Sequence, residues 1–115
     1  MRNQLILMTF LLYSTLSFSC TQYCRLINQC NGYQTSAFSL RDGYPRVSFC
    51  RSQFVNTANR INEVCSALAE GRASYAKDIL GDAITSLNAA NDANCKPSGS
   101  LQTFIATLSA FRNAL

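Results

Sequence analysis

The sequence predicts an all-α protein: a small disulfide-stapled bundle of about four helices that follows a cleaved signal peptide. Two observations lead to this prediction. Apolar residues recur every three or four positions in four segments, as on the buried face of a helix, at roughly 20–30, 48–70, 73–91 and 100–113. All six cysteines lie beyond the signal, and an even number in a short exported chain is typical of a disulfide framework.

Residues 1–19 have the pattern of a secretory signal peptide. Arg2 provides a short positive start, residues 5–13 form an apolar centre, and small residues precede the expected cleavage after Ser19. The apolar run is shorter than the ~20 residues that a helix needs to span a bilayer. We therefore expect a secreted protein with a single domain over residues 20–115 and no stable membrane insertion after cleavage, with an uncleaved anchor as the alternative.

The first predicted helix, residues 20–30, places three cysteines along one face and stops at Asn31 and Gly32. The second, residues 48–70, has a long apolar stripe with polar residues on its other side and ends near Gly71.

The third predicted helix, residues 73–91, contains Gly81, which costs roughly 1 kcal/mol relative to alanine. Pro97 then breaks the chain before the fourth helix, residues 100–113. The polar side of this last helix is almost uncharged, which indicates a face covered by a partner or by neighbouring helices.

The connection between the first two predicted helices, residues 31–48, is long for a helix connection. Tyrosine and arginine carry much of the binding energy at protein interfaces, and both are concentrated here. The candidate partner-binding residues are Tyr33, Arg41, Tyr44, Arg46 and Arg51. The alternative is that the apolar side chains of this segment cover the open end of the bundle while the arginines face water.

Helix geometry restricts how the cysteines can pair. Cys50 and Cys65 lie 15 residues apart on one predicted helix, about 22 Å at 1.5 Å per residue, whereas a disulfide needs Cα atoms within about 7 Å. With the borderline local pair Cys20 and Cys24 set aside, an antiparallel arrangement of the first two helices favours three bridges. These are Cys20 with Cys95, Cys24 with Cys65, and Cys30 with Cys50.

Other cysteine chemistry fits the sequence less well. A zinc site would need paired cysteines or supporting histidines, but the chain has no histidine and its later cysteines are scattered. A reactive thiol would need a group that lowers its pKa, and only Arg25 and Arg51 stand beside cysteines. Acylation of Cys20 would leave five thiols, an odd number. We therefore expect no bound metal and no cofactor.

Composition narrows the function. The net charge of +4 is mildly basic and lacks the dense basic stripe of a nucleic-acid binder. Asp78 and Asp82 could form an acid/base pair, but a solvated helix face beside Lys77 is the favoured explanation. Without histidine we expect no enzyme. We expect a small secreted binding protein, of effector, signal or inhibitor type, that recognises a protein partner through the 31–48 connection.

The alternative is an extracellular carrier of a small apolar ligand, such as a lipid or sterol, in an inter-helix pocket. The candidate lining residues are Phe49, Phe54, Leu80, Leu87, Phe104 and Phe111.

Overall fold

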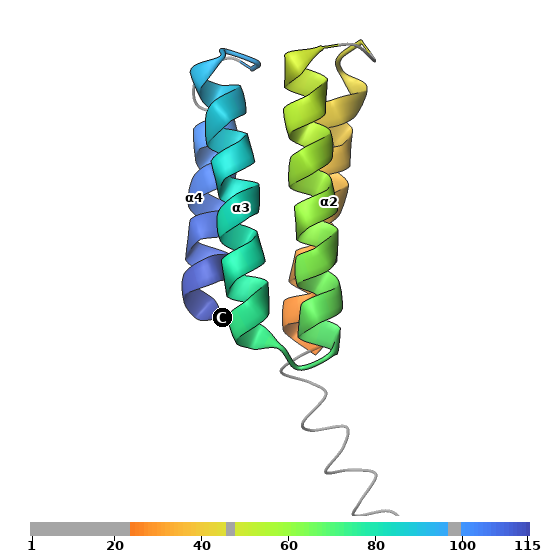
Figure 1. Cartoon of the computed structure of the whole chain (residues 1–115), viewed down its shortest axis with the longest axis vertical. Coiled ribbons are helices and arrows are strands. Elements are labelled where there is room, and N and C mark those ends of the chain that lie inside the picture. Colours follow the sequence, from red (N-terminus) through yellow and green to blue (C-terminus); the bar gives the residue numbers. More distant parts are fainter. Residues whose placement is uncertain (1–23, 46–47, 97–99) are drawn as a thin grey trace, which may run out of the picture.

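The computed structural model describes residues 24–45, 48–96 and 100–115, and in these ranges the chain forms an all-α bundle of four helices (Figure 1). An N-terminal helix covers residues 24–42. It is followed by α2 (Phe49–Ala69), α3 (Ala73–Asp92) and α4 (Ser100–Ala114). Successive helices run in opposite directions, with α2 and α3 side by side in front of the N-terminal helix and α4 (Figure 1). The predicted fold class is confirmed.

The N-terminal helix is longer than predicted. The sequence suggested a stop at Asn31 and Gly32, but the helix continues without a break to residue 42. A glycine inside a helix costs about 0.5–1 kcal/mol, and this local cost is outweighed by burial farther along. Ala37 is fully buried, and Tyr33 and Phe38 pack against the core. The supposed long connection therefore shrinks to a short loop that follows residue 42.

The ends of α2 are well defined by hydrogen bonds. The hydroxyl oxygen of Ser48 caps its start by accepting from the amide of Arg51 at 3.1 Å. At its end, the amide of Arg72 donates to the carbonyl of Ala67, and Gly71 adopts a positive φ of 74°. This is the Schellman arrangement, which glycine favours because it has no Cβ. The predicted end near Gly71 is confirmed.

A second Schellman arrangement ends α3. Here Asn94 adopts a φ of 57°, and the amide of Cys95 donates to the carbonyl of Ala90 at 3.0 Å. Asparagine tolerates this left-handed conformation better than most residues. The turn fixes Cys95 directly after α3, at the end of the bundle where α2 begins.

The core lies along the bundle axis and consists of the apolar stripes that the sequence indicated. Its largest fully buried apolar side chains come from α2, α3 and α4 and are Phe54, Ile61, Leu68, Leu80, Leu87, Leu101 and Leu108. Several residues expected to line a ligand pocket belong to this core, since Phe54 and Leu87 have no exposed surface. Phe49, another of them, is 55% exposed at the start of α2.

The disulfides differ from the predicted pairing. Cys30 bonds Cys65 and Cys50 bonds Cys95; Cys24 is also disulfide-bonded. All three predicted pairs, Cys20 with Cys95, Cys24 with Cys65 and Cys30 with Cys50, are therefore wrong. Cys20 itself lies outside the described residues.

The longer N-terminal helix explains this error. With the helix ending at residue 42 instead of 30, Cys30 lies about 18 Å farther from the loop, at 1.5 Å per residue. Because of that shift, Cys30 lies beside the C-terminal half of α2 and not beside Cys50 at its start. The sulfur of Cys30 lies 3.5 Å from the carbonyl oxygen of Ile61. Cys50 is then free to meet Cys95, so the first three cysteines cannot all bond to the last three.

Candidate functional site

The predicted partner-binding residues near the loop make contacts within the protein. The Arg51 guanidinium donates to the carbonyl of Tyr44 at 3.1 Å and to that of Arg41 at 3.5 Å, so it binds the end of the N-terminal helix to α2. The Tyr44 ring packs on Phe54 with centroids 5.5 Å apart, and the Lys96 ammonium lies 5.6 Å from the Tyr44 centroid. The described part of this segment thus covers the end of the bundle.

The other candidates are divided between the N-terminal helix and the loop. Arg41 forms an ion pair with Asp42 at 3.0 Å and lies over the Phe38 ring, 4.7 Å from its centroid. Tyr33 lies two turns earlier, with its ring edge-on to Phe111 at a centroid distance of 5.2 Å. Arg46 is outside the described residues. The structure does not bring Tyr33 together with Arg41 and Tyr44 into one recognition surface.

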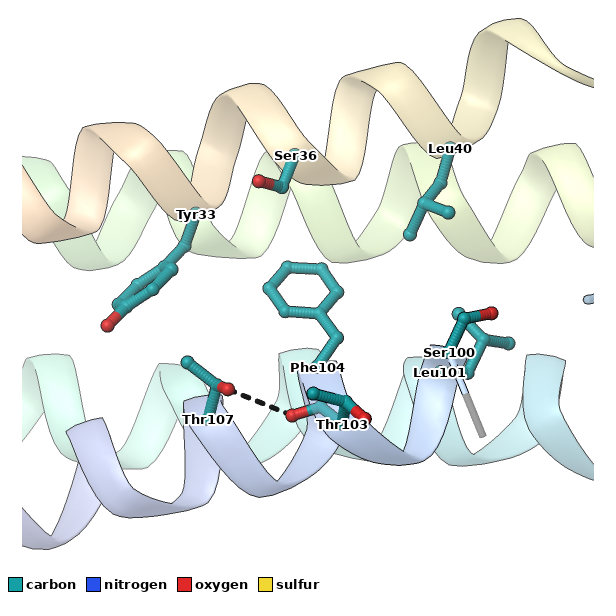
Figure 2. A pocket seen from close by; sticks show the side chains of 8 residues that line it. All are labelled: Tyr33, Ser36, Leu40, Ser100, Leu101, Thr103, Phe104 and Thr107. Carbon is teal, nitrogen blue, oxygen red and sulfur yellow. Dashed lines mark hydrogen bonds between the residues drawn. The ribbon is translucent and has the colours of Figure 1, made fainter. Parts of the chain in front are cut away.

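The N-terminal helix and α4 instead form the two sides of an open pocket of about 380 Å³, which we call the inter-helix pocket (Figure 2). Its described lining comes from these two helices and consists of Tyr33, Ser36, Leu40, Ser100, Leu101, Thr103, Phe104 and Thr107. The Phe104 ring projects from α4 toward the N-terminal helix, between Tyr33 and Leu40 (Figure 2). Two aromatic rings and two leucines thus give the pocket apolar walls.

The polar groups of the lining are hydroxyls and carry no charge. The Ser36 hydroxyl donates to the carbonyl of Gly32 at 3.1 Å, and the Thr107 hydroxyl donates to the carbonyl of Thr103 at 2.9 Å (the dashed line in Figure 2). Both bonds run along the helix to the residue four positions earlier, a local arrangement that serine and threonine commonly adopt. The hydroxyl protons of Ser36 and Thr107 are therefore used inside their own helices.

The two stretches of helix that line the pocket also contain no charged residue. Neither residues 26–40 nor residues 100–111 contain an aspartate, glutamate, lysine or arginine. We call these two stretches together the neutral face. In contrast, α2 and α3 carry exposed charges such as Arg60, Glu63 and Asp82. Because loss of charge is the compositional sign of a buried interface core, the neutral face is the better candidate for a binding surface.

Sequence reasoning identified this site only in part. It named Phe104 as a possible lining residue and noted the uncharged side of residues 100–113. It missed Ser36, because residues 31–48 were expected to be an irregular connection. It assigned no role to Thr107, because the helix that faces this residue had not been predicted. The available signal was the helical spacing of Tyr33, Ala37 and Leu40, which continues the apolar stripe past Gly32.

The remaining candidates for chemistry do not form a site. Asp78 and Asp82 are exposed on one face of α3. Within residues 24–45, 48–96 and 100–115, no group of three or more histidine, cysteine, aspartate or glutamate side chains could hold a metal ion. Over the same ranges, no helix has the length and apolar character needed to cross a membrane.

Comparisons with known proteins leave the structure as the guide to function. No protein-family model, no curated protein and no solved structure matches this chain.

Proposed function

We propose that this chain is a non-catalytic extracellular binding protein, and that the inter-helix pocket holds a small, largely apolar ligand without net charge. The observation that carries the proposal is the described lining of the pocket, which has apolar walls, several hydroxyls and no charged side chain. Its volume of about 380 Å³ falls within the range of ~300–1,000 Å³ typical of small-molecule sites.

The cysteines and the first residues of the chain support the proposed extracellular location. All described cysteines are disulfide-bonded, and such bonds persist in oxidising environments. The secretory pattern of residues 1–19 supports export as the route to that environment.

Recognition of a protein partner through the predicted tyrosines and arginines has less support. Arg51 and Tyr44 hold the end of the bundle together, and Arg41 is paired with Asp42. A partner that recruited these side chains would first have to break contacts that stabilise the fold. The pocket, in contrast, offers apolar surface that the described residues leave uncovered.

The proposal is tested by titration with N-phenyl-1-naphthylamine, an uncharged apolar fluorophore whose emission rises in an apolar environment. The matched variants are Ser36→Phe, at a lining position, and Ser39→Phe, three residues farther along the same helix and exposed outside the lining. We expect the unmodified protein to bind the fluorophore, Ser36→Phe to weaken binding at least tenfold by filling the pocket, and Ser39→Phe to leave it unchanged.

Circular dichroism should show the same helix content in both variants, because both positions are exposed. Two results would contradict the proposal: no binding to the unmodified protein, or equal binding by the two variants. Equal binding would place the fluorophore elsewhere on the surface.

A further inference from the structure

We infer that the polar group of the ligand is a hydroxyl, which donates a hydrogen bond to the hydroxyl oxygen of Ser36 or Thr107. The ligand class is therefore an apolar alcohol, as distinct from a fatty-acid anion of the same length. This inference rests on the proposed function, because it concerns the same pocket.

The first argument is the direction of the hydrogen bonds. A serine or threonine hydroxyl has one proton to donate and two lone pairs to accept with. Ser36 donates its proton to the carbonyl of Gly32, and Thr107 donates its proton to the carbonyl of Thr103. Each oxygen therefore meets a ligand as an acceptor. A group that donates, such as an alcohol hydroxyl, complements these oxygens, whereas an ether or ester does not.

The second argument is the absence of a countercharge. A carboxylate that enters an apolar site loses hydration and needs a cation or several donors in return. Among the described residues, no lysine or arginine lines the pocket. Arg41, next to the lining residue Leu40, is already paired with Asp42 and lies over Phe38. A fatty-acid anion would thus lose its hydration without gaining a cation from the described lining, whereas an uncharged alcohol needs none.

The experiment compares three probes of similar length: 1-decanol, 1-methoxynonane and decanoate. Each competes with N-phenyl-1-naphthylamine on the unmodified protein at pH 7.5. We expect 1-decanol to bind more than tenfold tighter than decanoate, because the anion loses its hydration. We expect it to bind about fivefold tighter than 1-methoxynonane, which has the same number of heavy atoms but cannot donate.

Hydroxyl-removing variants locate the contact. Ser36→Ala combined with Thr107→Val should remove the advantage of 1-decanol over 1-methoxynonane and leave the affinity for the ether within twofold. The matched control is Ser39→Ala combined with Thr85→Val. Thr85 also donates to the carbonyl four residues earlier, that of Gly81, but lies on α3 outside the pocket. The control should keep the full advantage.

The outcomes separate this inference from the function on which it rests. If all three probes bind with equal affinity, the pocket is a ligand site but its preference for an alcohol is refuted. The same holds if decanoate binds tightest, or if the alcohol keeps its advantage in the double variant. If the fluorophore and all three probes fail to bind the unmodified protein, the proposed function itself is refuted.

Discussion

Helices α2 and α4 are held in the bundle in different ways. Two disulfides leave α2, one from Cys50 near its start and one from Cys65 near its end, while α4 contains no cysteine. Eight of the 21 residues of α2 are buried, compared with three of the 15 residues of α4. The covalent links thus hold the N-terminal helix and the end of α3 to α2. In contrast, α4 is retained by packing, by the chain connection and by a hydrogen bond from Arg112 to the carbonyl of Lys77.

The difference between the two helices coincides with the position of the pocket. The pocket opens between the N-terminal helix and α4, the pair that neither of the two described disulfide bridges links. Apolar and aromatic contacts, such as the edge-on packing of Tyr33 on Phe111, close this side of the bundle. If the proposed ligand binds there, we expect that it can separate α4 from the N-terminal helix slightly without straining either bridge. We therefore expect the neutral face to be the adaptable side of the molecule and α2 to be its rigid support.

The largest effect should come from removing a link to α2. Combined Cys30→Ala and Cys65→Ala replacement should lower the free energy of unfolding by about 4 kcal/mol, because the bridge closes a loop with a sequence separation of 35. Removing Cys50 and Cys95 in the same way should cost a similar amount, because that separation is 45 and the effect grows only slowly with loop length. Guanidinium unfolding followed by circular dichroism measures both.

A loss below about 1 kcal/mol for either double variant would show that packing alone holds the N-terminal helix and α3 to α2. The disulfides would then not make α2 more firmly held in the bundle than α4.

The links to α2 also show what the sequence can and cannot predict. Helices α2, α3 and α4 lie within two residues of their predicted bounds, because long amphipathic stripes and turn residues such as Gly71 agree with each other. The end of the N-terminal helix was missed because Asn31 and Gly32 form a local stop signal that burial of Ala37 outweighs. That local signal conflicts with packing against helices distant in sequence, and a single sequence does not reveal which one prevails.

The same missed boundary limited the prediction of the site. In two antiparallel helices, an error in the length of the first helix shifts the position of each of its residues along the bundle axis relative to the second helix. The predicted position of Cys30 beside α2 was therefore wrong, and so was its predicted partner. The pocket was hidden for the same reason: Ser36 becomes a lining residue only when residues 33–40 are helical and face α4. Phe104 could be named because its helix was correctly placed. The volume of the pocket depends on how far apart two helices pack, which hydrophobic periodicity does not encode.

A second, smaller effect should distinguish how α4 is held. Leu108 in α4 and Leu87 in α3 are both fully buried, and replacing either with alanine should cost about 3 kcal/mol. In native-state hydrogen exchange, Leu108→Ala should lower the protection of the α4 amides more than that of the α2 amides, because α4 can open while the bridged helices stay together. Leu87→Ala should lower protection in all helices. Equal loss throughout the bundle in Leu108→Ala would show that α4 and α2 unfold as one unit.

The smallest effect concerns the contact between α3 and α4. Arg112 of α4 crosses α3 and donates from its Nε to the carbonyl of Lys77 at 3.0 Å. Its side chain lies over Gly81, where an added Cβ would be 3.5 Å from that Nε, an ordinary van der Waals distance. Gly81→Ala should therefore fit and stabilise the protein by about 0.5–1 kcal/mol, because alanine is the better helix former. Thermal unfolding should show a rise of roughly 2–8 °C.

The matched control for Gly81→Ala is Gly32→Ala in the N-terminal helix, where an added Cβ meets nothing within 4 Å. Both replacements gain the same helix propensity. Any difference between their gains in stability therefore measures whether the new methyl group fits against the side chain of Arg112. Equal gains would show that α4 tolerates the new methyl group without moving. A smaller gain, or a loss, for Gly81→Ala would show that Arg112 must shift and weaken its bond to Lys77, so that α4 would be held by a precise contact with α3. That result would replace the picture of α4 as the adaptable wall of the pocket with one in which the N-terminal helix has to move.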